Sequence, residues 1–467
     1  MCHAAFWQPT SSLKLYKIRE KLAGTIGAFP LNMRTTSLSL LVLLSLSTAA
    51  CSGSVGPGDE PGPTFDVARS SLARDTKPDA TPAELTALAE GNADFALRMH
   101  ALLAQHSQDN VFFSPLSITT ALSMAYAGAK GDTATEMAQA LRLHLPAERQ
   151  HVAMNALDLE LASRSEAQPA APSGKPFALR SVNTMFGQKG VPFESPFLDT
   201  LATSYGVGVQ LADFHGRSEP ERLKINAWVE RQTEKKIRNL LGPGSISALT
   251  RLVLVNAVYF NADWAEPFEK EATRDQDFTG LDGGVNKVPT MHGIPSAGYA
   301  ETEAYQALEL PYMGNKVSMV FVLPRGDFRT FERSLDGKGL LSMFAGLKTS
   351  KVLVSLPKFE IRGDAVSLKK PLGVLGMVKA FDDGEADFSG IVSPSVEKLK
   401  IADVLHKAFL RVDEKGTEAA AATAVDFETT SAVLEQHKFT ADRPFLVFIR
   451  DVPTNAVVFA GRIASPG

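Results

Sequence analysis

The chain has 467 residues, of which 44% are hydrophobic and 21% are charged, and its formal net charge at pH 7 is −4. This length can bury a large core, and a composition near the globular average argues against disorder throughout the chain. The slightly acidic balance, without a basic stripe, gives no reason to expect nucleic acid as a partner. Its two cysteines, Cys2 and Cys51, both precede the region expected to fold, which excludes a disulfide framework and a cysteine-based zinc site there. We expect no metal and no cofactor.

Residues 1–50 are predicted to be a signal or targeting segment. An apolar run, Ser37 to Ala50, follows Arg34 and ends in small residues. A positive end, a short apolar stretch and a small-residue cleavage site are the parts of a secretory signal, in that order. The run is too short to span a bilayer comfortably as a helix. Because residues 1–32 are untypical of such a signal, we expect the true translation start at Met33, and an exported protein.

Cys51 directly follows these small residues, an arrangement that resembles a bacterial lipoprotein signal. The resemblance implies that Cys51 is lipidated and anchors the protein to a membrane, in the periplasm or at the cell surface. Thr48 departs from the pattern, which usually has leucine at that position. Plain signal-peptidase cleavage with secretion, and an unprocessed buried helix, are the alternatives.

Residues 51–81 are predicted to be a flexible tether, since they are rich in Gly, Pro, Ser and Asp and have few large apolar residues. A helix is predicted to begin at Thr81-Pro82-Ala83-Glu84, because threonine caps amide groups, proline suits the first helical position and Glu84 completes a capping box. Apolar residues with helical spacing follow from Leu85 to Leu103. The folded domain is therefore expected to span residues 82–467.

Short apolar runs rich in β-branched and aromatic residues predict buried strands, and a helix is predicted over Ile225 to Leu241. The strand runs are Leu252 to Phe260, Val317 to Leu323, Val352 to Leu356 and Phe445 to Ile449. Strands and helices alternate irregularly, without a repeat of fixed period. The fold class expected from this mixture is one large α+β domain.

Ten motifs resemble the serpin family and occur in the family's order between residues 85 and 465. They are residues 110–117 (NVFFSPLS), 128–133 (GAKGDT), Asn226-x-Trp228-Val229, 254–260 (LVNAVYF), Trp264 with Pro267-Phe268, 356–359 (LPKF), 386–390 (ADFSG), 406–408 (HKA), 413–419 (DEKGTEA) and 439–446 (FTADRPFL). Each motif alone is weak, but the ordered set is specific.

The resemblance implies a serpin fold with three β-sheets, eight or nine helices and a long exposed reactive loop from about Glu414 to His437. It also implies a suicide-substrate inhibitor of serine or cysteine proteases, whose cleaved loop inserts into the central sheet and traps the acyl-enzyme. A non-inhibitory serpin, acting as a carrier or a surface interaction protein, is the alternative. An enzyme is not expected, since no GxSxG, HExxH or suitably placed GxGxxG motif is present.

The reactive loop has its own sequence pattern. From Thr417 to Thr429, alternate residues are uncharged, and every charge lies in the intervening set that contains Glu418, Asp426 and Glu428. Period two with all charges on one side is typical of a strand with one buried face. An ordinary helix, favoured by alanine and glutamate, and a solvated loop are the alternatives.

The resemblance assigns roles to further residues. Small hinge residues are expected to enter the sheet first; the hinge is Glu414, Gly416, Thr417, Glu418, Ala419, Ala420, Ala421 and Ala422. A polar shutter beneath the sheet would comprise Ser114, Ser117, Asn256 and His406. Trp264 matches the breach at the top of the sheet. Glu414 and Lys358 resemble an ion pair at the base of the loop, which contributes about 0–1 kcal/mol if it is exposed.

The reactive bond is predicted at Thr430-Ser431, fourteen residues on from Gly416, since the insertable arm has a nearly fixed length in inhibitory serpins. Ala432, Val433 and Leu434 remain alternatives for the recognised residue. No lysine or arginine occurs between Gly416 and Gln436, so a trypsin-like target is not expected. We expect a monomer that inhibits an elastase-like or subtilisin-like protease.

Overall fold

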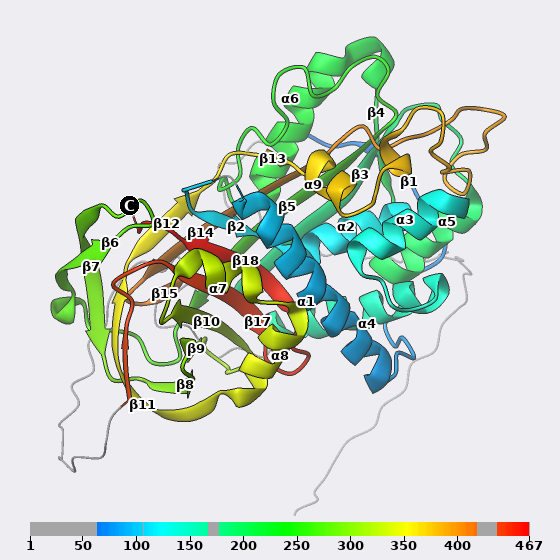
Figure 1. The fold of residues 1–467 in the computed structure, drawn as a ribbon. Helices are drawn as coiled ribbons and strands as arrows, with labels where there is room; N and C mark the ends of the chain where they lie inside the picture. Colours follow the sequence, from blue (N-terminus) through cyan, green and yellow to red (C-terminus); the bar gives the residue numbers. More distant parts are fainter. Residues whose placement is uncertain (1–62, 106, 167–176, 418–436, 467) are drawn as a thin grey trace, which may run out of the picture. The chain divides into compact units, whose positions relative to one another are not determined.

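The computed structural model describes residues 63–105, 107–166, 177–417 and 437–466 (Figure 1). These residues belong to one compact unit, Glu60–Gly467. The predicted targeting segment and Cys51 lie outside the described residues. Within the described part of the chain, no helix is long and apolar enough to cross a membrane.

Nine α-helices occur in the described residues. They are α1 Pro82–Ala104, α2 Pro115–Tyr126, α3 Gly131–Leu141, α4 Ala147–Glu166, α5 Ser195–Thr200, α6 Phe214–Gln232, α7 Phe328–Ser334, α8 Gly337–Gly346 and α9 Lys369–Val374. The predicted start of α1 is confirmed: the Thr81 hydroxyl accepts from Glu84 N–H, and the Glu84 carboxylate accepts from Thr81 N–H. This reciprocal cap satisfies two amides that a helix start otherwise leaves unpaired.

One sheet, here called the central sheet, carries the features that matter for function. Its hydrogen-bonded order is β1 Asp66–Ala68, β4 Val209–Ala212, β3 Ala178–Gln188, β5 Leu252–Asp263, β15 Gly416–Thr417, β14 Val404–Asp413 and β12 Phe359–Arg362, with β13 Val366–Ser367 beside β14. β5 is buried along its whole length, which explains why most of its residues are apolar.

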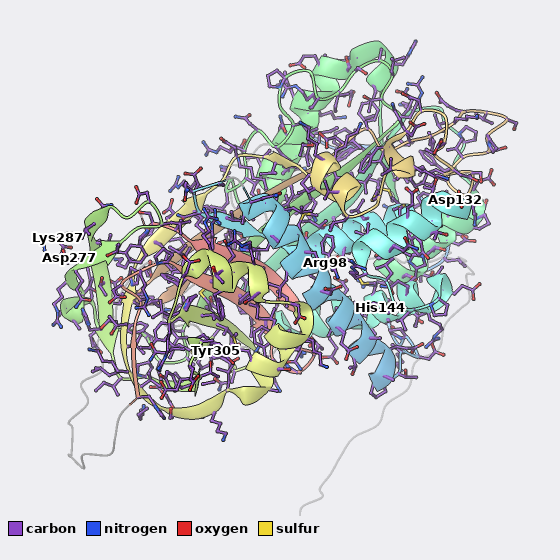
Figure 2. All side chains as sticks on the ribbon, in the orientation of Figure 1. Arg98, Asp132, His144, Asp277, Lys287 and Tyr305 are labelled. Atoms are coloured by element: carbon purple, nitrogen blue, oxygen red, sulfur yellow. The ribbon has the colours of Figure 1, made fainter. Side chains whose placement is uncertain are left out.

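A second hydrogen-bonded network follows the order β2 Val111–Phe113, β18 Val457–Ile463, β17 Phe445–Asp451, β10 Val317–Pro324, β9 Tyr305–Pro311, β8 Ser296–Glu301, β11 Lys348–Pro357, β7 Val285–Gly293 and β6 Arg274–Thr279. The first half of β11 pairs with β8, and its second half pairs with β7 and with β16 His437–Thr440. This network therefore divides at β11 into two sheets, and with the central sheet it gives the three sheets expected. At the β6–β7 hairpin, Lys287 and Asp277 form an ion pair at 3.2 Å (Figure 2).

The core has two parts. The larger one surrounds α2, which packs against β3 and β5 on one side and β18 on the other. The smaller one, here called the outer cluster, covers the opposite face of the central sheet, where α6 and the segment after it pack on β3 and β5. Ile225 and Val229 of α6 belong to the outer cluster, together with Val253 and Val255 of β5.

The predicted helix over Ile225 to Leu241 is wrong in its second half, because α6 ends at Gln232. Glu234 and Lys235 have φ of 50° and 64°, in the left-handed region, which ends the helix. Ile237, Leu240 and Leu241 nevertheless reach the outer cluster from an irregular segment. Their apolar spacing coincided with that of a helix.

The predicted tether over residues 51–81 is also wrong for its described part. Asp66–Ala68 pairs antiparallel with Val209–Leu211 as an edge strand of the central sheet. The Phe65 ring packs edge-on against Phe186 with centroids 4.9 Å apart, and Arg74 forms an ion pair with Asp158 at 2.6 Å. These few contacts hold a segment whose composition alone suggests a linker, so the folded domain begins before residue 82.

Candidate functional site: a seam in the central sheet

The central sheet has a seam between β5 and β14. Val404–Ala408 of β14 pairs directly with Leu254–Val258 of β5, and the two strands are parallel there. Further along, β15 lies between them and pairs antiparallel with both. Thr417 is opposite Ala262 on one side and Val412 on the other. The sheet is thus joined directly at one end of the seam and through the two residues of β15 at the other.

Gly416 can enter the seam because it has no side chain. Its φ is 152°, and a Cβ built on it would lie 2.1 Å from the carbonyl oxygen of Ala262. Any other residue would therefore have to push the strands apart at this point.

Thr417 is fully buried, and its hydroxyl hydrogen-bonds to the Tyr312 hydroxyl at 2.7 Å. The prediction that the exposed loop begins at about Glu414 is wrong for these two residues, since the sheet offers Gly416 and Thr417 backbone partners on both sides. The remaining hinge residues, Glu418 to Ala422, and the predicted reactive bond Thr430-Ser431 lie outside the described residues.

Trp264 lies at the entrance of the seam. Its indole Nε1 donates to the carbonyl oxygen of Asp413 at 3.0 Å, and its backbone N–H donates to Lys415 O at 2.7 Å. The indole stacks on the Tyr312 ring with centroids 4.5 Å apart and an interplanar angle of 11°. Because Tyr312 also bonds Thr417, a stack of two buried aromatic rings links β15 to the turn that precedes it.

Glu414 and Lys358 form the expected ion pair, with Nζ–Oε2 at 2.9 Å. The pair is not fully exposed, as the side chains are 11% and 32% accessible. Burial raises the pKa of Glu414, but hydrogen bonds from Lys358 and Thr273 outweigh it and leave the pKa below its ordinary value. The charged pair therefore fixes the turn from which the hinge enters the sheet.

The four predicted shutter residues lie together where β5 and β14 pair directly. The His406 Nε2 accepts from Ser114 N–H at 3.1 Å, so the ring proton is on Nδ1, which donates to Asn256 Oδ1. The Ser114 hydroxyl caps α2 by accepting from Ser117 N–H, and it donates to Val458 O at 2.6 Å. The Asn256 amide donates to Ser117 Oγ. One continuous network therefore joins α2, both strands of the seam and β18.

Burial lowers the pKa of His406 to about 3, so this histidine is neutral. Its neutral form also fits the network, because a second ring proton on Nε2 would face the Ser114 N–H. The cluster is thus made of neutral groups that can exchange partners without burying a charge.

Sequence reasoning missed two residues of this site. Asn183 of β3 accepts from the Asn256 amide at 2.6 Å and extends the shutter to a third strand. Tyr312 links Trp264 to Thr417. Asn183 lies in a strand of mixed polar and apolar composition, so neither its local sequence nor that of Tyr312 indicates the role.

The described residues contain no group of three or more His, Cys, Asp or Glu side chains that could hold a metal ion. The observed chemistry of the seam is that of strand pairing, hydrogen bonding and ring stacking.

The fold and the seam define an α+β protein whose central sheet holds a short hinge strand between two longer strands. A family model described as "Serpin (serine protease inhibitor)" matches residues 90–466. Serpin B6 of Macaca fascicularis is 39% identical over 386 residues, which cover 81% of this chain and 99% of that protein. Antithrombin-III of Homo sapiens is 33% identical over 448 residues, with coverage of 92% and 96%. The chain belongs to the serpin family.

Solved structures agree with this assignment. The crystal structure of tengpin, a thermophilic serpin, in the native state matches with a TM-score of 0.72 and 28% identity, covering 81% of this chain and 94% of that one. Members of the family are generally protease inhibitors and not catalysts; many inhibit serine proteases, and some are non-inhibitory.

Proposed function

We propose that this protein is a suicide-substrate inhibitor of serine proteases and that its cleaved loop inserts along the seam. The observation that carries the proposal is β15, because Gly416 and Thr417 already pair with β5 and β14. The following residues can extend this strand only by separating Val404–Ala408 from Leu254–Val258, where the strands now pair directly.

The register of β15 specifies where each loop residue would go. Thr417 is opposite Ala262, and each step along the loop moves one residue back along the antiparallel β5. Phe427 would then lie opposite Leu252, the first residue of β5. Twelve loop residues, Gly416 to Phe427, would fill the length of β5, and a cut at Thr430-Ser431 lies beyond them.

The same register accounts for the alternation in the loop. Thr417 faces the core, so the uncharged residues at every second position after it would face the core as well. Thr423 would arrive opposite both Asn256 and His406, which now face each other across the seam. A threonine hydroxyl would thus replace partners that the shutter loses when the strands part. Glu418 would lie on the outer face, opposite Arg411.

The proposed inhibition is kinetic. The protease serine attacks the carbonyl carbon of Thr430, the peptide bond to Ser431 breaks, and the amine of Ser431 leaves with the C-terminal fragment. The ester to Thr430 remains until water hydrolyses it. Insertion adds a ladder of hydrogen bonds and carries the esterified protease with it. A displacement of about 1 Å within the protease active site slows deacylation by orders of magnitude.

A small uncharged residue at position 430 suits the shallow apolar pockets of elastase-like or subtilisin-like proteases. The absence of lysine and arginine between Gly416 and Gln436 leaves no partner for the buried carboxylate of a trypsin-like pocket. We therefore propose covalent inhibition of elastase-like or subtilisin-like enzymes by a monomer, without nucleic acid as a partner.

We also propose that the protein is exported and anchored through lipidated Cys51. One lipid chain binds a membrane only marginally, and more than one gives stable anchoring. Cys51→Ser should move the protein from the membrane fraction to the soluble fraction. Wild-type protein found wholly soluble and unmodified at its N-terminus would contradict the anchor.

The function is tested by incubating the protein with subtilisin and with pancreatic elastase and running denaturing gels. We expect a complex that resists boiling in SDS, with a mass equal to the two proteins less the released C-terminal fragment. A fragment that begins at Ser431 supports the predicted bond, and one that begins at Glu435 moves it to Leu434 and favours chymotrypsin-like targets. Cleavage without any complex would favour a non-inhibitory serpin.

A further inference from the structure

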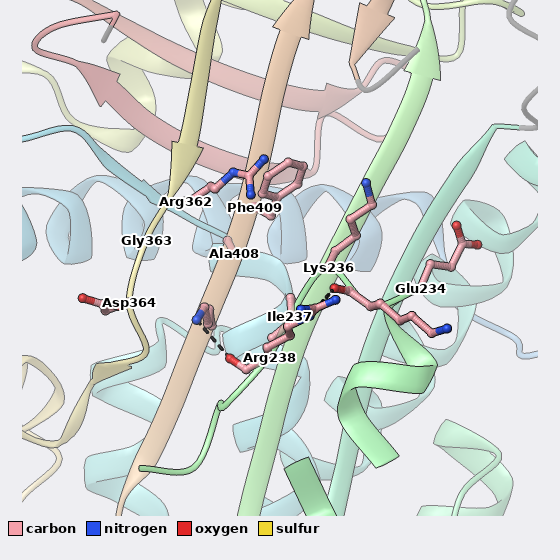
Figure 3. A pocket seen from close by; sticks show the side chains of 11 residues that line it. Glu234, Lys236, Ile237, Arg238, Arg362, Gly363, Asp364, Ala408 and Phe409 are labelled. Atoms are coloured by element: carbon pink, nitrogen blue, oxygen red, sulfur yellow. Dashed lines mark hydrogen bonds between the residues drawn. The ribbon is translucent and has the colours of Figure 1, made fainter. Parts of the chain in front are cut away.

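A pocket of about 600 Å³ lies over the seam, at the point where β5 and β14 stop pairing directly (Figure 3). Ala408, the last residue of β14 that pairs with β5, lines it together with Phe409. One wall is the segment Glu234–Arg238, which follows α6, and the other is formed by Arg362 to Asp364 after β12. The pocket is on the outer face of the sheet, since Ile237 packs in the outer cluster. Lys407 lies on the same face, because it is two residues on from Leu405, which contacts that cluster, and alternate residues of a strand share a face.

Cations dominate the lining of this pocket. Five lysines and arginines contribute to it, against two carboxylates; the cations are Lys235, Lys236, Arg238, Arg362 and Lys407. Both carboxylates, Glu234 and Asp364, point away from its centre in Figure 3. Arg238 pairs with Glu230 at 3.0 Å, and Arg362 pairs with Glu360, and both of these carboxylates lie outside the pocket.

Two of the cations share a common floor, the Phe409 ring. The Lys236 ammonium and the Arg362 guanidinium approach the Phe409 ring from different walls, 5.6 Å and 5.7 Å from its centroid. The Lys407 ammonium donates to Arg238 O at 3.1 Å. Backbone strain marks the same place, because Glu234 and Lys235 are consecutive non-glycine residues in the left-handed region.

We propose that this pocket binds a small molecule that carries two or more phosphate groups. Guanidinium groups match phosphate oxygens in a two-pronged geometry, and lysines add point charges. The volume exceeds the needs of a single phosphate and lies within the range of small-molecule sites. A ligand with several phosphates can contact both walls at once, which a single phosphate cannot do.

Binding would also regulate insertion, a consequence that rests on the proposed function. Lys236 and Arg238 flank Ile237, which packs in the outer cluster together with residues of β3 and β5, whereas Arg362 lies on β12 and Lys407 on β14. Insertion separates β14 from β5. A ligand that bridges the two walls therefore stabilises the uncleaved form and slows insertion.

The test is calorimetric titration of the uncleaved full chain with sodium tripolyphosphate at low ionic strength. We expect a dissociation constant in the micromolar range, weakened at least tenfold in the double variant Arg362→Gln/Lys407→Gln. Glutamine at position 407 can still donate a hydrogen bond, and circular dichroism verifies the fold. The matched control is Lys287→Gln on the β6–β7 hairpin (Figure 2), where the lysine side chain is 72% accessible; it should bind as the wild type does. Absence of binding, or equal affinity of the double variant, overturns the site.

A parallel titration uses adenosine triphosphate. Tighter binding of tripolyphosphate indicates that the natural ligand is an inorganic phosphate chain, and tighter binding of adenosine triphosphate indicates a phosphate ester. Saturating tripolyphosphate should slow covalent complex formation at least fivefold in the wild type but not in the double variant. An unchanged rate in the presence of bound ligand overturns the bridging role. If the chain inhibits no protease, the proposed function fails, while calorimetry still decides the site.

Discussion

Replacement of Thr417 by arginine places a charge at the first inserted position of the seam. The wild-type side chain is fully buried, and its hydroxyl bonds the Tyr312 hydroxyl at 2.7 Å. The Tyr312 ring in turn packs against Trp264 and Phe260. A guanidinium in that position would have to replace a small hydroxyl in a fully buried site beside the Tyr312 ring.

The structure indicates how the variant would respond. Burial of an unpaired ion costs several kcal/mol. Withdrawal of β15 instead breaks the backbone hydrogen bonds that Gly416 and Thr417 make with β5 and β14. At a net value of about 1 kcal/mol per hydrogen bond, this withdrawal costs roughly 2–4 kcal/mol in all. We therefore expect the variant to remain folded with its hinge outside the sheet. Insertion would then have to bury the guanidinium first, and an added barrier of about 3 kcal/mol slows it about a hundredfold.

The assay is the stoichiometry of inhibition with subtilisin, read on denaturing gels as the ratio of complex to cleaved protein. Slow insertion lets the protease complete hydrolysis, so Thr417→Arg should be cleaved almost entirely as a substrate. Thr417→Ser is the matched control, since it keeps the hydroxyl for Tyr312, and it should inhibit nearly as the wild type does. Wild-type stoichiometry in the arginine variant would refute the insertion argument.

Cleavage in the loop should raise the melting temperature by tens of degrees, as the family resemblance implies, and a scan that shows an unchanged or lower transition after nicking would point to a non-inhibitory member. Thr430→Arg should add covalent inhibition of trypsin without loss of insertion, because the hinge is untouched; cleavage by trypsin without a complex would place the reactive bond elsewhere. The free energy of unfolding should fall as the pH drops from about 6.5 towards 3, because the unfolded chain binds a proton at His406 that the folded chain, with a pKa of about 3 there, does not. Urea midpoints should therefore depend on pH more steeply in the wild type than in His406→Gln, and equal slopes would show that His406 is not the group responsible.

Local signals in the sequence predicted the elements whose contacts are local. The α1 cap depends on four consecutive residues, and both of its hydrogen bonds are present. The apolar runs predicted β5, β10, β11 and β17, although all four strands extend further than predicted. The composition of residues 51–81 predicted a tether, which is wrong for the described part of this segment. A few specific contacts, chiefly those of Phe65 and Arg74, hold that part against the domain, and an average composition does not show them.

The site was harder to predict because its contacts join distant parts of the chain. The family motifs supplied Ser114, Asn256 and His406, and the structure brings them together. No sequence pattern shows that Thr417 pairs with the sheet before cleavage, since this depends on where β5 and β14 separate. Tyr312 was missed for the same reason.

A crystal structure of the protein after loop cleavage tests the central claim most directly. We predict a strand that continues β15 between β5 and β14 in unchanged register, with Thr423 opposite both Asn256 and His406 and Phe427 opposite Leu252. A cleaved structure in which Val404–Ala408 still pairs directly with Leu254–Val258 would contradict the account.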